Sequence, residues 1–269
     1  MAAILPDVAK VEAAIVEATN AFRTEHKLAA VRSEPRLARA ARAYAQFLAS
    51  RGLFSHTADG RQPQQRVEAA GYTYCETAEN LALHQDSRGF EATDLAHKAV
   101  EGWMNSPGHR RNLLNEAVTD IGVAVAKAPD VHPKYIAVQL FGRPRSLAVV
   151  FQISNTSGTK IGYSFAGKTH DVAPHYSVTH TECRAGAITF SVPGGLFSAA
   201  KEIGKFEARD GATYTLKPAP KGGIVVDVGK REKLKVPKRD APADPRAGSA
   251  SRASASGAAP APASRESGR

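Results

Sequence analysis

Near Leu147 the spacing of the apolar residues changes, and this change constrains the fold more than any other feature of the chain. Before it, apolar residues recur at intervals of three and four, which is the period of amphipathic helices. After it, short apolar runs are separated by Gly, Asn, Asp and Pro, which is typical of β-strands and turns. The 269 residues are enough for two domains with separate cores. We therefore expect a mixed domain over residues 1–145 and an all-β domain over residues 146–229.

The first region combines helical and strand patterns. Helical spacing predicts helices over residues 8–22, 35–48 and 94–104, and the second of these begins at a proline, a favoured first residue of a helix. Two β-branched, apolar runs at residues 120–127 and 135–143 predict a hairpin or two neighbouring strands of one sheet. Helices that outnumber strands in this way favour an α/β fold built from packed layers.

The second region has strand patterns throughout. Its runs, from LAVVFQISN to GGIVVDVG, have the length and the turn signals of a small β-sandwich or barrel. Beyond it, residues 230–269 are rich in Ala, Ser and Pro and offer little to bury in a core. A segment of this composition is expected to be disordered.

The net charge of +10 does not predict a protein that binds nucleic acid. Residues 230–269 carry ten Lys or Arg and four Asp or Glu, so this tail alone accounts for +6. The tail holds no aromatic residue that could stack on bases, and the other +4 is spread over the preceding 229 residues. We expect a solvated tail, with an electrostatic tether to anionic envelope polymers as the alternative.

Two further features bear on the location of the protein. No stretch approaches the roughly 18 consecutive apolar residues of a membrane helix, and the first residues lack the basic and apolar regions of a signal peptide. We expect either a cytoplasmic protein or a numbering that begins after a removed signal. Cys75 and Cys183 leave two alternatives open: one disulfide in an oxidising compartment, or two buried thiols.

Five motifs of the first region occur in one order: FSHTADG, AAGYTYCETAENLA, AVEGWMNSPGHRRNLL, IGVAVA and YIAVQLFG. Together they resemble the CAP superfamily, the SCP-like domains of cysteine-rich secretory proteins, antigen 5 and plant pathogenesis-related proteins. The spacing is most similar to that of the cysteine-poor bacterial members. The resemblance implies an α-β-α sandwich, a secreted or envelope location, and a cleft in which two histidines and two acidic residues face each other.

Transferred position by position, the resemblance implies that His56, Glu79 and His109 lie in this cleft. The position of the second acid, three residues after the tryptophan, holds Ser106, so one carboxylate is missing and Ser106 lies in the cleft in its place. Glu101 is a candidate replacement, but its spacing from the tryptophan places it on a different face of the helix.

The sequence around His109 supplies a physical reason for such a role. Ser106 and Pro107 predict the N-cap and the first residue of a helix, so that His109 lies in its first turn. The positive end of the helix dipole disfavours the imidazolium ion there, and a neutral ring is expected near pH 7. A neutral imidazole can bind a metal ion or accept a proton. The alternative is that His109 only hydrogen-bonds a neighbouring loop.

His56 and His109 are therefore candidate ligands of zinc or another divalent metal ion, with Glu79 as a direct or water-bridged third ligand. Zinc sites normally use three or four protein ligands, so this set predicts weak binding. The resemblance also implies small apolar, lipid-like ligands, since sterol and lipid binding have been attributed to CAP domains along with metal binding, signalling and proteolysis.

These features favour a secreted or envelope-associated binding protein over an enzyme, and no catalytic residue is assigned. Ser106 is the candidate nucleophile beside a site histidine, and its hydroxyl is expected to cap a helix instead. One alternative is a metal-assisted peptide or ester hydrolase that uses His56, Glu79 and His109 around an activated water. Another makes the first domain a scaffold and the β domain the part that adheres to an envelope component.

Three histidines of the second region, His170, His175 and His180, precede Cys183 and suggest a further metal site. On one continuous strand His175 would point away from the other two. Pro174 would let the three converge if it broke the strand, and both arrangements stay open.

Overall fold

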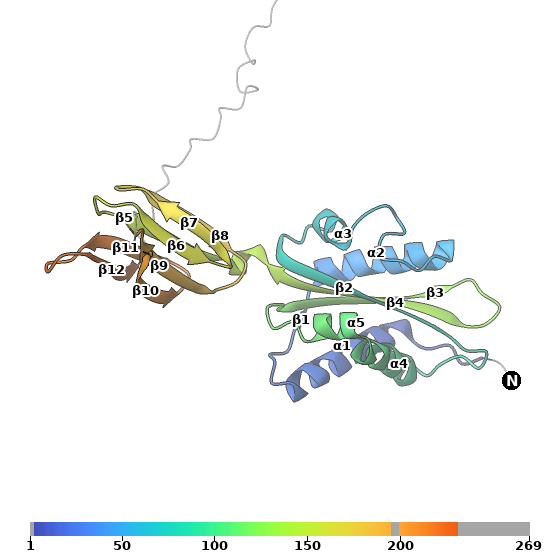
Figure 1. The fold of residues 1–269 in the computed structure, drawn as a ribbon. Helices are drawn as coiled ribbons and strands as arrows, with labels where there is room; N and C mark the ends of the chain where they lie inside the picture. The colour runs from blue at the N-terminus through green and yellow to red at the C-terminus, as the bar shows by residue number, and fades with distance from the viewer. Residues whose placement is uncertain (1–2, 195–198, 231–269) are drawn as a thin grey trace, which may run out of the picture. The chain divides into compact units, whose positions relative to one another are not determined.

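The computed structural model describes residues 3–194 and 199–230. The first region is an α-β-α sandwich, as expected (Figure 1). Its helices are α1 (Val8–Glu25), α2 (Pro35–Arg51), α3 (Pro63–Ala69), α4 (Ala92–Asn105) and α5 (Pro107–Leu113). Its strands are β1 (Arg32–Ser33), β2 (Tyr74–Gln85), β3 (Asp120–Ala128) and β4 (Lys134–Pro144). The sheet has the order β1-β3-β4-β2, which makes β2 an edge strand.

The expected helices α1, α2 and α4 and the antiparallel pair β3 and β4 are confirmed. Helix α2 begins with Pro35 and ends at Gly52, whose left-handed backbone (φ 64°) closes the helix. Next to α2, a Cβ atom at Gly122 of β3 would lie 2.2 Å from a backbone atom of Leu37. The glycine therefore allows the helix and the sheet to approach closely.

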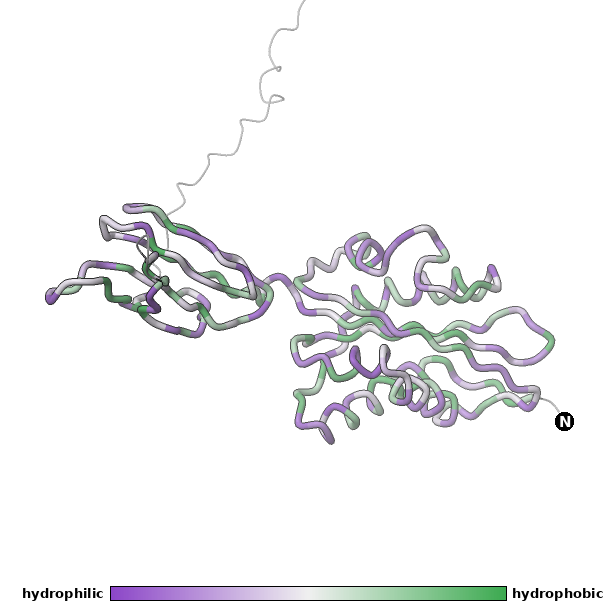
Figure 2. The backbone as a smooth tube through the Cα atoms, viewed as in Figure 1, coloured by the Kyte–Doolittle hydropathy of each residue, from purple (hydrophilic) through white to green (hydrophobic). Residues whose placement is uncertain are grey.

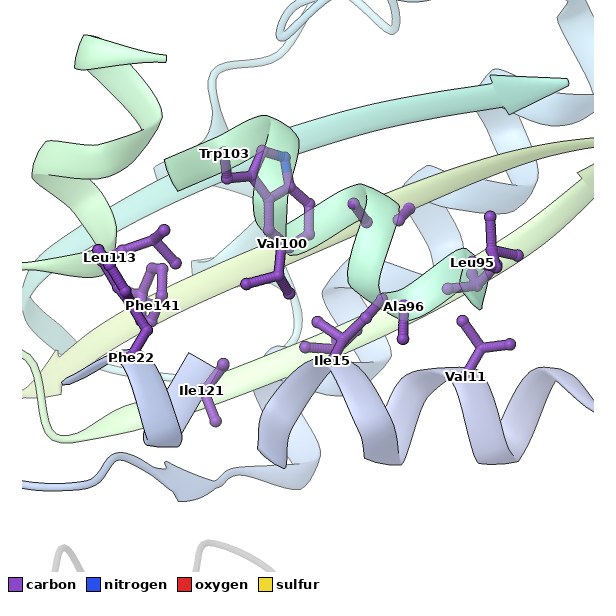
Figure 3. Packing of buried hydrophobic residues seen from close by; sticks show 14 of the residues in the cluster. Val11, Ile15, Phe22, Leu95, Ala96, Val100, Trp103, Leu113, Ile121 and Phe141 are labelled. Atoms are coloured by element: carbon purple, nitrogen blue, oxygen red, sulfur yellow. The ribbon is translucent and has the colours of Figure 1, made fainter. Parts of the chain in front are cut away.

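Side chains of β3 and β4 alternate between two cores, because successive residues of a strand point to opposite faces of the sheet. Val123 and Val125 of β3 lie in the core beneath α1, α4 and α5, whereas Ala124 and Ala126 lie in the core beneath α2 and α3. Figure 3 shows the first of these cores, with Trp103 among its buried residues. Since both faces are covered, the two strands are apolar along nearly their whole length (Figure 2).

The second region is a β-sandwich of two four-stranded sheets, as expected. Its strands are β5 (Val149–Asn155), β6 (Ile161–Phe165), β7 (Lys168–Val172), β8 (Ser177–Glu182), β9 (Ala187–Val192), β10 (Lys201–Glu207), β11 (Ala212–Pro218) and β12 (Ile224–Lys230). The sheet orders are β10-β9-β6-β7 and β12-β11-β5-β8. Phe151, Phe190 and Tyr214 are fully or almost fully buried in the core of this region.

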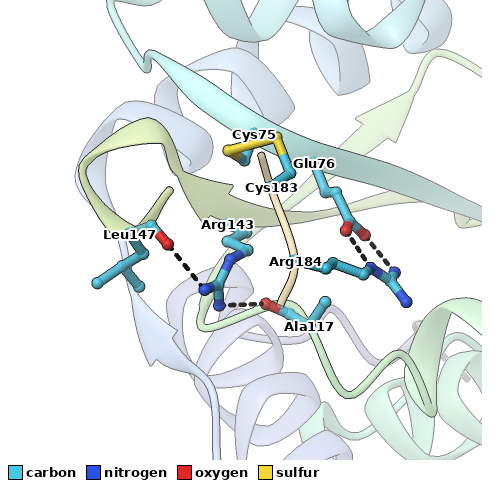
Figure 4. Close-up of a disulfide and its surroundings, with 7 residues drawn as sticks. All are labelled: Cys75, Glu76, Ala117, Arg143, Leu147, Cys183 and Arg184. Atoms are coloured by element: carbon cyan, nitrogen blue, oxygen red, sulfur yellow. Dashed lines mark hydrogen bonds and ion pairs between the residues drawn. A yellow bond between two sulfur atoms is a disulfide. The ribbon is translucent and has the colours of Figure 1, made fainter. Parts of the chain in front are cut away.

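A disulfide joins Cys75 of β2 to Cys183, which follows β8 (Figure 4). This decides between the two alternatives that the sequence left open. The residue after each cysteine adds an ion pair, because the Arg184 guanidinium donates to both carboxylate oxygens of Glu76. Disulfide and ion pair together tie the edge strand of the first region to the second region.

The described residues belong to one compact unit, although the two regions within it have separate cores. The division at residues 145 and 146 stays a prediction. The expected disorder of residues 230–269 concerns residues that, Lys230 excepted, lie outside the described ones. Within residues 3–194 and 199–230, no helix is both long and apolar enough to cross a membrane.

Candidate functional site

The site lies at the edge strand β2, where segments from both helical layers reach one another. Glu79 and Asn80 are consecutive and buried, so their side chains point to opposite faces of the sheet. Glu79 contacts His56, in the loop after α2, whereas Asn80 contacts α5, which carries His109. An edge strand has no neighbour beyond it, and this allows residues of the two layers to meet around it.

Glu79 is the centre of the site. Its side chain is 1% exposed, and its Oε1 atom lies 2.8 Å from Nδ1 of His56. An ionised carboxylate only accepts hydrogen bonds, so Nδ1 of His56 carries the proton. The His56 ring is half exposed, and Nε2 is its second nitrogen. Glu79 therefore fixes both the orientation and the tautomer of His56.

Arg66 of α3 holds Glu79 in turn, and the sequence analysis did not identify it. Its Nη2 atom donates to both carboxylate oxygens, at 3.1 and 2.9 Å, and to the carbonyl of His56 at 2.9 Å. Its Nη1 atom donates to Asp59 at 2.8 Å. The guanidinium also lies 3.5 Å from the ring centroid of Tyr44. A buried arginine between two carboxylates thus supports the histidine from behind.

Buried amides fix α5 on the other face of β2. Asn80 donates to Gln139 at 3.0 Å and accepts from Asn112 at 2.8 Å, while Gln139 donates to Thr19 of α1 at 2.9 Å. Asn112 lies one turn after His109 in α5, so this chain of hydrogen bonds positions the histidine. The role of Asn80 is thus to hold a helix against the sheet.

The His56 and His109 ring centroids lie 6.5 Å apart, with the ring planes tilted by 49°. Burial lowers the pKa of His109, and the neighbouring His56 lowers it further. The direction agrees with the expectation of a neutral ring near pH 7. The cause differs, since burial and the second histidine take the place of the helix dipole.

Ser106 is the junction between α4 and α5, as its N-cap position and Pro107 predict. Its hydroxyl, however, makes no capping hydrogen bond, contrary to the expectation. Within the described residues no hydrogen bond joins this hydroxyl to His56, Glu79 or His109 either. The Ser106 carbonyl accepts the first intrahelical hydrogen bond of α5, from Arg110 N at 2.8 Å. Glu101, the candidate replacement acid, is exposed on α4.

Residues 16–141 match the model of the cysteine-rich secretory protein family, CAP. The chain contains a CAP domain. Two Bacillus subtilis proteins are similar to it: the uncharacterized protein YkwD, 30% identical over 125 residues, and the uncharacterized membrane protein YlbC, 31% identical over 115 residues. These matches cover 46% and 42% of this chain, and 46% of YkwD and 31% of YlbC. The chain thus spans less than half the length of the curated relatives it matches.

Three solved structures are similar to the CAP domain and cover 51% of this chain each. An outer surface protein of Borrelia burgdorferi is 25% identical with a TM-score of 0.45, over 96% of that protein. An extracellular protein with an SCP domain from Bacillus anthracis is 26% identical with a TM-score of 0.43, over 41% of it. A cysteine-rich secretory protein of Staphylococcus aureus is 21% identical with a TM-score of 0.38, over 39% of it.

In this CAP domain the donor set for a metal ion is smaller than the sequence suggests. Glu79 was expected as a third ligand, but both of its oxygens are engaged by Arg66 and one also by His56. Within residues 3–194 and 199–230, no three His, Cys, Asp or Glu side chains are arranged to hold a metal ion. His56 and His109 remain as two candidate donors, with Glu79 as the residue that orients the first.

The histidines of the β region belong to different elements. His170 lies in β7 of one sheet and His180 in β8 of the other, and their ring centroids are 5.8 Å apart. His175 lies in the turn between them, with a left-handed backbone (φ 63°). The chain therefore does break near Pro174. His180 Nε2 is 2.9 Å from the Tyr163 hydroxyl, so this histidine is part of a side-chain network.

Proposed function

We propose that the CAP domain binds a divalent metal ion, zinc or one of similar chemistry, at His56 and His109, and that the protein acts as a binding protein. One observation carries the proposal. The buried Glu79 accepts a hydrogen bond from the Nδ1–H group of His56, which leaves Nε2 of this half-exposed ring as the nitrogen that can bind a metal ion. Metal-bound histidines commonly hydrogen-bond a carboxylate through their other nitrogen, which fixes the ring and makes it a better ligand.

The second histidine fits the same role. Its lowered pKa keeps the His109 ring neutral at pH 7, which is the form that binds a metal ion. Two imidazoles on one zinc ion have ring centroids about 5–6 Å apart, and the two rings here lie 6.5 Å apart. A small side-chain rotation would bring them to a common ion. Since two protein ligands leave the other positions to water, the expected affinity is micromolar.

The proposal places the protein in an oxidising compartment, secreted or associated with the cell envelope. Disulfides persist in such compartments and are rare in the cytosol. The Cys75–Cys183 disulfide supports this location.

A metal-assisted hydrolase is the second candidate, and one observation favours it. A histidine held by a buried carboxylate is also the arrangement of a general base, and His56 and Glu79 have it. A bound metal ion would supply a water of lowered pKa as nucleophile. The Ser106 hydroxyl makes no capping bond and reaches neither histidine through a hydrogen bond in the part of the chain described, so we assign it no role.

Zinc titration by calorimetry at pH 7.5 tests the proposal. Micromolar binding is expected for the protein, loss of it for His56→Ala/His109→Ala, and no change for His170→Gln in the β region. Unchanged binding in the double variant, or loss of it in His170→Gln, would contradict the proposed site. Peptide or ester turnover that His109→Ala abolishes would establish the hydrolase instead. If zinc does not bind, the small apolar ligand of the CAP resemblance becomes the candidate.

A further inference from the structure

A pocket of about 590 Å³ lies away from the histidine pair, against α2, α3 and the loop between them. A cavity of this size can hold one small molecule. His56 and His109 do not line the pocket, but it shares Arg66, Asp59 and Tyr44 with the network behind Glu79.

The floor of the pocket is apolar and aromatic. Tyr44 and Phe47 of α2 contribute parallel rings with centroids 6.3 Å apart and an interplanar angle of 8°. Ala40 and Ala43 of α2 and Ala70 after α3 line the pocket between them. Short alanine side chains leave room for a ligand, and the partly exposed Phe47 ring offers it an apolar surface. The Tyr44 ring is 1% exposed and lies under the Arg66 guanidinium, so it supports this lining from within.

Positive charge surrounds this floor. Four arginines and a single acid, Asp59, line the pocket. Asp59 accepts from Arg61 at 3.0 Å and from Arg66 at 2.8 Å. Arg39 is exposed and donates to the carbonyl of Ala70, a neutral partner, at 3.0 Å. Its charge is thus available to an anion at the mouth of the pocket.

We propose that this pocket binds an amphipathic anion, a single molecule with an apolar or aromatic body and one carboxylate, sulfonate or phosphate group. The body lies against Phe47 and the alanines of the lining, and the acidic group meets the exposed Arg39. Guanidinium groups suit such oxygens because they donate along two parallel directions. The proposal does not depend on metal binding at His56 and His109.

Fluorescence titration with anilinonaphthalene sulfonate tests the proposal, with phenylnaphthylamine as the neutral probe of the same ring system. We expect the sulfonate to bind more tightly than the neutral probe. Arg39→Gln should weaken the sulfonate about tenfold, as loss of one charge-assisted hydrogen bond predicts, and leave the neutral probe unchanged. Ala43→Trp, which fills the pocket, should abolish binding of both probes. Arg51→Gln, on the same helix outside the pocket, is the matched control and should change neither.

Three results would overturn the proposal: equal affinity for the two probes, an unchanged sulfonate affinity in Arg39→Gln, or unchanged binding in Ala43→Trp. A circular-dichroism melt of each variant shows that it is folded. Competition then identifies the source of the ligand. Displacement by dodecyl phosphate indicates a lipid, displacement by phenyl phosphate a soluble aromatic acid, and displacement by neither contradicts an amphipathic anion.

Discussion

The molecule holds two pairs of neighbouring histidines in opposite surroundings. The rings of His56 and His109 in the CAP domain are 6.5 Å apart, and those of His170 and His180 in the β region are 5.8 Å apart. The first pair is backed by the buried ion pair of Glu79 and Arg66. The second pair lies among aromatic rings, with Phe151 stacked on His180 at 4.9 Å.

The difference shows that distance alone does not make two histidines a ligand site. His180 lies 2.9 Å from the Tyr163 hydroxyl through Nε2 and 3.4 Å from Glu182 through Nδ1, so both of its nitrogens have partners. In His56 the carboxylate engages Nδ1 only, and the ring is half exposed. The binding role that we propose therefore concerns the CAP pair, whereas both nitrogens of His180 in the β pair are engaged within the fold. Four changes test this comparison.

The largest effect is expected from removing the buried cation behind the CAP pair. Arg66→Met leaves Glu79 buried without its arginine and Asp59 with Arg61 alone. Breaking a buried ion pair costs about 3–5 kcal/mol of unfolding free energy. Urea denaturation measures the loss. The control is Arg61→Met, which removes an exposed partner of the same Asp59 and should cost less than about 1 kcal/mol. Equal losses in the two variants would contradict the buried network.

The next effect concerns the covalent link between the two regions. Cys75→Ala/Cys183→Ala removes a crosslink that spans 108 residues, for which a stability loss of about 2–4 kcal/mol is typical. Because the regions have separate cores, calorimetry should show two unfolding transitions where the oxidised protein shows one. Reductant should reproduce this result in the unmodified protein and change nothing in the double variant. A single transition in the double variant would show that other contacts couple the regions.

A smaller effect is expected in the β pair. Tyr163→Phe removes the hydroxyl that lies 2.9 Å from His180 Nε2, and one lost hydrogen bond costs about 0.5–1.5 kcal/mol. Tyr176→Phe is the control, because Tyr176 is 68% exposed and its change should lie within about 0.5 kcal/mol. Thermal melts measure both. If Tyr163→Phe lost as much stability as Arg66→Met, the contrast between the two histidine pairs would be contradicted.

The smallest effect is a dependence on pH. The pKa of His109 is held below its ordinary value of about 6.5 by burial and by His56, so the unfolded chain binds a proton more readily than the folded one. The contribution of the neutral His109 ring to the free energy of unfolding is complete above about pH 6.5. It is lost as the pH falls through the lowered pKa of His109. His109→Asn should therefore reduce the fall in Tm between pH 7 and pH 5.

Part of the fall in Tm between pH 7 and pH 5 should persist in His109→Asn, because the pKa of His84 is lowered too. Burial is the main cause there, and the charge of Lys98 is the second. His84→Asn is thus a matched variant for the same melts. If neither substitution changes the fall in Tm between pH 7 and pH 5, the lowered pKa values of His109 and His84 are both contradicted.

The elements that the sequence predicted are those whose periodicity is local. Helices α1, α2 and α4 and strands β3 and β4 each carry their own apolar pattern, and the β-sandwich follows from its regular turns. Strand β2 was missed because CETAEN is polar, although Glu79 and Asn80 within it are buried. The polar residues of β2 find their hydrogen-bond partners in other segments of the chain. A local sequence pattern cannot reveal such partners.

For the site, the resemblance of the sequence motifs to the CAP family nominated His56, Glu79 and His109, and the fold brings His56 onto Glu79 from 23 residues away. Only the tertiary structure decided their roles. It made Glu79 the support of His56, added Arg66 behind it, and closed the disulfide across 108 residues. Periodicity is a property of one segment, whereas a hydrogen bond or an ion pair depends on which distant segments are brought within about 3 Å.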